Sequence, residues 1–314
     1  MNNLLEKVFN METKHVHLFF LSKSDKRDDF EVFSTNPDSE IRSEVKILIH
    51  KQIANYLSDD ECEPPIEYSP IFDDNSIVQK IDCGELKLLP NLIDKINVKS
   101  PIYDKTKLRK GHKLWLVAIL MDDGIDKILS LQKIRSRTLL ESKKTCWSID
   151  EKISKFENQL LVLDDKIDCI CLLENEDLSN QTMYIFHKYY FEQIFGFEEK
   201  FKKEIKNMLD ELEIDDESSI KLDLEKFYSK IENNSRSLKK LYVILNNKNF
   251  NYLTEENIEK IETKSKDLKF NRSNGFLKLD SYDDIKKILN LLNDDYLEGI
   301  LSQKPFKTSN KVDF

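Results

Sequence analysis

The chain has 314 residues, of which 34% are charged and 39% hydrophobic, so it can bury a sizeable core beneath a strongly solvated surface. The net charge is −9, so the chain is not basic overall. Its six glycines are never closer than 13 positions. This spacing excludes the glycine-rich phosphate loops and the Gly-x-Ser-x-Gly nucleophile elbow.

The first half of the chain is predicted to be rich in strands. Residues 15–21 and 28–34 read as a β-hairpin, and a helix follows from Asn36, a good N-cap with Pro37 behind it. Residues 59–75 are acidic and read as a loop. A short strand and a helical stretch interrupted at Pro90 precede a buried strand at 114–121. Short apolar segments, typical of an antiparallel meander, then occupy 126–132, 136–141, 160–163, 167–173 and 182–187.

The second half has helical periodicity. Apolar residues recur at helical spacing over 188–213, and the last helix is expected to begin at Ser281 with Asp284 completing a capping box. Further segments are predicted as helices at 221–232, 235–246 and 254–266 and as a strand at 276–280. Since strands and helices do not alternate, we predict an α+β fold with a mostly antiparallel sheet in a strand-rich region 1–180 and a helix-rich region 181–314.

Positive charge is concentrated in one segment. Residues 99–144 contain twelve basic and five acidic residues, a balance of +7, whereas the rest of the chain sums to −16. A basic patch on an acidic protein is typical of a polyanion-binding site, because an acidic remainder keeps nucleic acid away from other surfaces. We therefore predict DNA contacts from Lys99, Lys105, Lys107, Arg109, Lys110, Lys113, Lys133, Arg135, Arg137, Lys143 and Lys144.

Catalytic patterns are weak. Metal-dependent nucleases use an acid, a gap and then acid-x-Lys, and two sets have this order: Asp74 with Glu85 and Lys87, and Asp123 with Glu141 and Lys143. The 58 acids of a lysine-rich chain produce such triplets by chance. The sequence leaves enzymatic activity open, favours a non-catalytic role and assigns no catalytic residue, metal or cofactor. His15 and His17 read as a surface pair.

Targeting signals are lacking. The N-terminus has no signal-peptide pattern, and no apolar run approaches the roughly 20 residues of a membrane-spanning helix. Five scattered cysteines favour reduced thiols. We expect a cytoplasmic protein.

The stretch from Tyr184 to Phe201, with Tyr189-Tyr190-Phe191 and Phe195-Gly196-Phe197, resembles the strand-then-helix signature of the KwaB-like family of the bacterial Kiwa anti-phage system. The likeness covers roughly 180–310 and continues in Lys239–Tyr242, Phe276–Asp280 and Leu291–Leu297, while residues 298–306 depart from it.

The resemblance implies a DNA-binding defence effector that works with KwaA, a small multi-span membrane protein. It transfers no catalytic or metal-binding residue. Together with the basic segment, it predicts a non-catalytic DNA-binding homo-oligomer that a membrane partner recruits to the inner membrane. Two alternatives remain open: a metal-dependent nuclease of the same system, and an interaction scaffold that binds no DNA.

Overall fold

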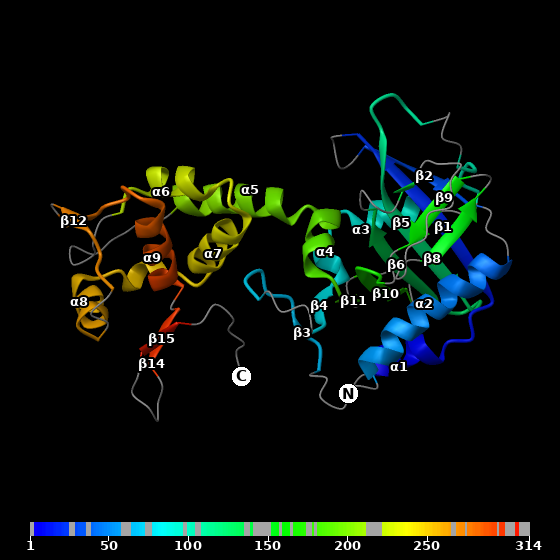
Figure 1. Ribbon diagram of the computed structural model, residues 1–314, viewed down its shortest axis with the longest axis horizontal. Helices are drawn as coiled ribbons and strands as arrows, with labels where there is room; N and C mark the ends of the chain where they lie inside the picture. The colour runs from blue at the N-terminus through cyan, green and yellow to red at the C-terminus, as the bar shows by residue number, and fades with distance from the viewer. Residues whose placement is uncertain are drawn as a thin grey trace. The chain divides into compact units, whose positions relative to one another are not determined.

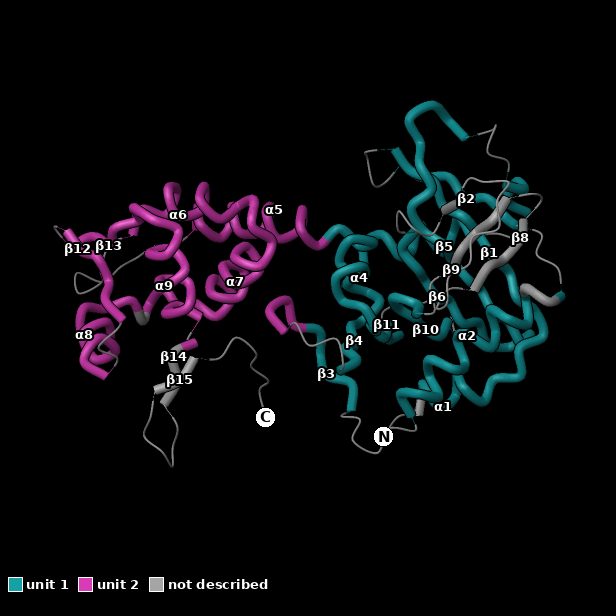
Figure 2. Tube along the Cα trace, in the orientation of Figure 1, with its two compact units in different colours: residues 1–68, 75–196 teal, residues 69–74, 197–314 magenta. Residues whose placement is uncertain are grey.

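The chain divides into two compact units, residues 1–68 with 75–196 and residues 69–74 with 197–314, coloured separately in Figure 2. We call these the sheet unit and the helical unit. The computed structural model describes 3–24, 29–35, 39–57, 64–72, 77–96, 99–103, 108–134, 139–140, 152–156, 159–163, 166–173, 178, 181–211, 222–264, 268–273, 275–293, 295–298 and 305–307.

An eight-stranded sheet forms the body of the sheet unit, in the order β2-β1-β5-β6-β10-β11-β4-β3 (Figure 1). Every neighbouring pair is antiparallel except β3 with β4. Its strands are β1 (His15–Lys23), β2 (Phe30–Ser34), β3 (Ile66–Glu67), β4 (Gln79–Asp82), β5 (Lys113–Asp122), β6 (Lys127–Lys133), β10 (Cys169–Leu173) and β11 (Thr182–Ile185). The predicted hairpin of β1 and β2 is confirmed, and β3 lies within the segment predicted as a loop.

Both faces of the sheet are buried. One face carries Leu18, Ile119 and Ile170 beneath α1 (Asn3–Asn10) and α2 (Ser39–Leu57), and we call it the α1/α2 face. Residues of alternate parity point to the opposite face, where Phe19, Leu131 and Cys169 are also buried. The amide of Gln52 on α2 both donates to and accepts from the backbone of Ile167, and this fixes the helix against the sheet.

The predicted meander is divided between two sheets. β7 (Leu139–Leu140), β8 (Lys152–Phe156) and β9 (Gln159–Leu163) form a separate sheet in the order β7-β9-β8. β6 therefore pairs directly with β10, which follows it by more than 30 residues. Short apolar segments predict strands, but they do not say which strands pair, because pairing depends on distant residues.

Two predicted helices differ from the expectation at single residues. The helix predicted at 188–213 is broken into α4 (Lys188–Phe195) and α5 (Phe197–Asp210), because Gly196 adopts a left-handed φ of 75° and caps α4. Pro90 lies in the first turn of α3 (Leu89–Lys95) and so begins that helix instead of interrupting it. In both cases a helix is present in the predicted segment, but the residue at which a helix begins or ends differs from the expectation.

The helical unit contains α5 and all the later α-helices of the described residues. They are α6 (Leu224–Ile231), α7 (Ser235–Asn246), α8 (Glu255–Lys264) and α9 (Tyr282–Leu292), with the short strand pairs β12 (Arg272–Ser273) with β13 (Phe276–Leu277) and β14 (Tyr296–Glu298) with β15 (Pro305–Lys307). The capping box predicted for Ser281 and Asp284 is present. The predicted α+β class is confirmed, with the large antiparallel sheet in the first half and most helices in the second.

Within the described residues, no helix combines the length and the apolar character that crossing a membrane requires.

Candidate nucleic-acid interface

The β5–β6 hairpin separates the charges of the basic segment. Lys113 begins β5 and Lys133 ends β6, so both lie at the open end of the hairpin, whereas Asp122 pairs with Lys127 at the turn. Asp123 and Asp126 lie in that turn as well. Ten residues of strand span about 30 Å, so the acidic turn and the basic open end are far apart.

A third lysine joins the open end from a different part of the sequence. Lys23, the last residue of β1, is the cross-strand partner of Lys113. Register and alternation place Lys23, Lys113 and Lys133 on the face opposite α1 and α2, on three neighbouring strands. The sheet therefore gathers three cations at one end of one face, and we call this set the lysine row.

Aromatic rings lie among these lysines. Trp115 sits at a bulge in the β1–β5 pairing, with the Nζ of Lys23 4.5 Å and that of Lys133 5.6 Å from the ring centroid. Phe30 on β2 makes an edge contact with Trp115 at 6.5 Å, and Lys95 of α3 lies 4.1 Å from the Phe30 centroid. Both rings are buried, so the lysine ammonium groups and not the rings are accessible at this end of the described sheet.

Carboxylates lie on the other side of the same end. The Nε of Arg109 lies 2.7 Å from Glu31, and its Nη1 lies 3.6 Å from Asp29. His112 lies 3.6 Å from Asp29, 3.8 Å from Glu31 and 3.5 Å from the hydroxyl of Ser22. Since Ser22 pairs with Glu31 and the two belong to the α1/α2 face, Arg109 is turned away from the lysine row.

Five of the eleven predicted DNA contacts lie in the described part of the chain. Lys113 and Lys133 belong to the lysine row, Lys110 is exposed just before β5, and Arg109 is paired with acids. Lys99 precedes the segment that bonds to Ser34, at the opposite end of β2 from Phe30. The other six predicted contacts lie outside the described residues: Lys105, Lys107, Arg135, Arg137, Lys143 and Lys144.

The nuclease candidates do not assemble into a site within the described residues. One oxygen of Asp123 accepts the backbone N–H groups of Ile125 and Asp126, each at 2.8 Å, and these bonds lower the pKa of that carboxyl. Asp123 thus closes the hairpin turn. Glu141, Lys143 and Asp74 lie outside the described residues. Where the structure is described, no three His, Cys, Asp or Glu side chains gather as a metal site would need.

His15 and His17 stack side by side on β1, with ring centroids 6.2 Å apart. Burial, followed by the charge of His15, lowers the pKa of His17. Cys83, Cys169 and Cys171 are buried free thiols. Burial raises the pKa of the Cys169 thiol, and a hydrogen bond with Cys83 together with burial raises that of Cys171.

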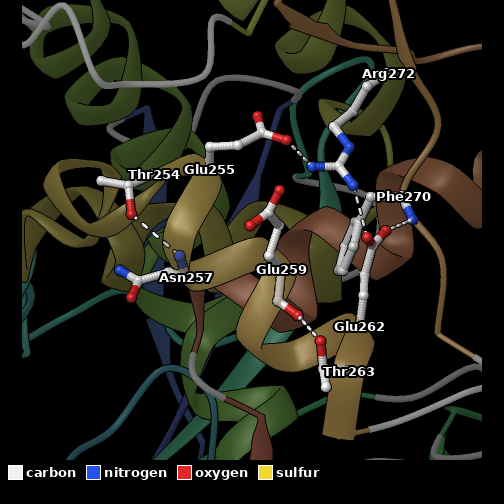
Figure 3. Close-up of polar contacts among 8 residues, drawn as sticks. All are labelled: Thr254, Glu255, Asn257, Glu259, Glu262, Thr263, Phe270 and Arg272. Atoms are coloured by element: carbon white, nitrogen blue, oxygen red, sulfur yellow. Dashed lines mark hydrogen bonds and ion pairs between the residues drawn. The ribbon is translucent and has the colours of Figure 1, made fainter.

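In the helical unit, Arg272 and Lys240 have carboxylate partners. Figure 3 shows Arg272 between Glu255 and Glu262, and Glu262 also accepts the N–H of Phe270 at 2.8 Å. Lys240 pairs with the fully buried Asp295 and donates to Asn290 at 3.0 Å. These contacts hold the fold together: the Lys240 pair is buried, and the Arg272 pairs are partly exposed.

Sequence reasoning missed Lys23, Lys95 and Trp115. The first two lie outside the basic segment, and Trp115 was read only as part of a buried strand. A count of charges along the chain could not find them, because strand register and helix packing bring them together. The available signal was weaker: Lys23 lies between the predicted strands 15–21 and 28–34, in the turn of the predicted hairpin, and the structure extends β1 to include it.

Comparison with known protein families matches residues 112–302 to the family described as Kiwa protein KwaB-like. The match begins just before β5 and continues to β14, so it reaches further toward the N-terminus than the resemblance seen in the sequence. No curated protein and no solved structure matches the chain. Since the match covers more than half of the chain, the protein belongs to the KwaB-like family, and this membership implies a component of Kiwa anti-phage defence.

Proposed function

We propose that the protein binds DNA through the phosphate backbone and contributes to Kiwa defence without catalysing a reaction. One observation carries the proposal: the β5–β6 hairpin gathers Lys113 and Lys133 at its open end and sends Asp122, Asp123 and Asp126 to the turn. Lysines act as point charges on phosphates and do not read base edges, so the binding should be independent of sequence.

Retardation of linear duplex DNA over a salt series tests the proposal. Binding through phosphates requires the logarithm of the association constant to fall linearly with the logarithm of salt concentration, by about 0.9 for each contact. Retardation that does not depend on salt would contradict this mode, and absence of retardation at low salt would favour an interaction scaffold.

The same DNA incubated with Mg²⁺ separates binding from cleavage. We expect full-length DNA after incubation, because Asp123, one of the proposed metal ligands, is committed to the hairpin turn. New DNA ends that vanish with a chelator would instead identify a metal-dependent nuclease.

We further propose that the protein acts from the cytoplasm as a homo-oligomer, recruited to the inner membrane by a KwaA-like multi-span partner. Membership of a family of Kiwa components suggests that the protein acts with protein partners. Co-expression with the adjacent defence gene product should move the protein into the membrane fraction, and expression alone should not. The mass of the purified protein measured by light scattering tests the oligomer, and the mass of a monomer would contradict it.

A further inference from the structure

The lysines at the open end of the hairpin include residues from outside the basic segment 99–144. We propose that Lys23 and Lys95 complete the phosphate-binding surface with Lys113 and Lys133, and that Trp115 and Phe30 are the positioning residues that hold these side chains. The inference rests on the proposed DNA binding and assigns that function to a specific face of the sheet. Its ligand is the phosphodiester backbone of a nucleic acid.

The first argument is the cost of bringing like charges together. Lys23 and Lys113 are direct cross-strand partners, and like charges in such pairs are destabilising. Lys133 lies on the next strand, on the same face. Its Nζ and that of Lys23 lie 5.6 and 4.5 Å from the same Trp115 ring centroid. A bound polyanion offsets this repulsion, and successive phosphates of one nucleic-acid strand supply negative charge at comparable spacing.

The second argument is that the rings bring the lysines together. The single indole of Trp115 attracts the ammonium groups of both Lys23 and Lys133. Trp115 is the extra residue at the β-bulge, and bulges commonly redirect side chains next to functional sites. The indole is 2% exposed, and its buried Nε1 has no hydrogen-bond partner among the described residues, so the residue cannot stack on a base and acts through the lysines.

The third argument extends the row to β2. The Nζ of Lys95 lies over the Phe30 ring and donates to the carbonyl oxygen of Phe30 at 3.1 Å. One of its three donors is therefore used to anchor the side chain, and the group keeps its full charge. Because Phe30 contacts Trp115 edge to face, the two rings form a continuous buried support beneath Lys95, Lys23 and Lys133.

The fourth argument is the position of the acids. Asp29 and Glu31 pair with Arg109 and approach His112 on the side of the α1/α2 face. Near Lys133, the buried Asp168 accepts the backbone N–H of that residue at 2.5 Å. These three carboxylates of the described residues lie behind or beneath the row, and the exposed Lys113 and Lys95 mark the side from which a phosphate can approach.

The double variant Lys23→Gln/Lys95→Gln tests the inference by DNA retardation over a salt series. Each lost contact should lower affinity about 5.5-fold at 0.15 M salt, so the pair should lose about 30-fold and the salt slope should become shallower by about 2. Lys14→Gln/Lys127→Gln is the matched control, because it removes two lysines near the acidic turn of the hairpin. This control should bind within twofold of the unchanged protein.

The arginine variant Lys23→Arg/Lys95→Arg should retain the salt slope, since it keeps both charges. Trp115→Phe tests whether the indole positions the lysines. This variant should bind DNA more weakly, because a smaller ring orders the lysines less well. Its salt slope should fall by less than about 1, because no charge is removed. Thermal unfolding of each variant confirms that it is folded. Unchanged affinity in a folded Lys23→Gln/Lys95→Gln protein would overturn the inference while leaving DNA binding intact. Failure of the unchanged protein to bind DNA would overturn the proposed function itself.

Discussion

Cations are held in different ways in the two units. In the helical unit, Lys240 and Arg272 each have carboxylate partners, and the partner of Lys240 is fully buried. At the end of the sheet, Lys23 and Lys95 lie over aromatic rings. A carboxylate cancels the charge of a cation within the fold, whereas a ring orients the cation and leaves its charge in place. In the proposed function, a paired cation contributes to stability and a ring-held cation contributes to the potential that attracts a polyanion.

Lys240→Met should have the largest effect, because it leaves Asp295 buried without its cation. We expect a loss of about 3–5 kcal/mol in the free energy of unfolding, measured by urea denaturation. The double variant Lys240→Met/Asp295→Leu should recover most of this loss, since both charges are then removed. DNA affinity of the folded fraction should not change. A loss below about 1 kcal/mol in the single variant would mean that the pair is not a structural element.

Glu31→Gln should strengthen DNA binding slightly, because it removes a negative charge from the end of the sheet that carries the lysine row. We expect about twofold tighter binding at 0.15 M salt with an unchanged salt slope, since Arg109 is turned away from the row and gains no phosphate contact. Glu67→Gln is the control: it removes a carboxylate that pairs with Lys80 on β4, away from the lysine row. If both variants changed affinity equally, net charge alone would explain the effect and the local arrangement would not.

Arg272→Gln should reduce the stability of the helical unit by about 1 kcal/mol, because it removes two partly exposed ion pairs that join β12 to α8. Lys287→Gln, which breaks an exposed pair with Asp283 along α9, should cost less than about 0.5 kcal/mol. Equal losses measured by urea denaturation would contradict the ranking. Neither variant should alter DNA affinity.

Ser281→Ala should cost about 0.5–1 kcal/mol at pH 7, since it removes the N-cap of α9. The hydrogen bond from the Ser281 side chain lowers the pKa of Asp284 below its ordinary value of 3.8. Because the pKa of Asp284 is lower in the folded than in the unfolded protein, this carboxylate stabilises the fold at pH values above its unfolded pKa. That stabilisation is lost as the pH falls through the folded pKa. Urea denaturation should therefore show the difference between the two proteins shrinking below about pH 4. If the stability lost in Ser281→Ala were the same at every pH, the cap would stabilise the protein independently of the ionisation of Asp284.

Much of the fold was predictable because local rules determined it. The capping box of Ser281 and Asp284 and the turn after Asp122 follow from residues within a few positions of one another. The break at Gly196 was missed because the apolar period continues from Ile194 to Phe201 without interruption, so periodicity alone could not reveal the left-handed residue.

The candidate site was predictable only in part, for a related reason. Charge counting found Lys113 and Lys133, but it could not tell that Lys127 and the acids of the turn lie at the far end of the hairpin. Nor could it find Lys23, which strand register places beside Lys113 from 90 residues away. Local sequence determines which residues are charged, and pairing between distant strands determines which charges meet.

The most direct test of the account compares the two ends of the β5–β6 hairpin in one DNA-binding measurement. Lys113→Gln/Lys133→Gln removes two lysines from the open end, and Lys14→Gln/Lys127→Gln removes two near the turn, so both proteins have the same net charge. The account predicts about 30-fold weaker binding for the first at 0.15 M salt, a slope shallower by about 2, and less than twofold change for the second. Equal losses in the two folded variants would contradict a localised site.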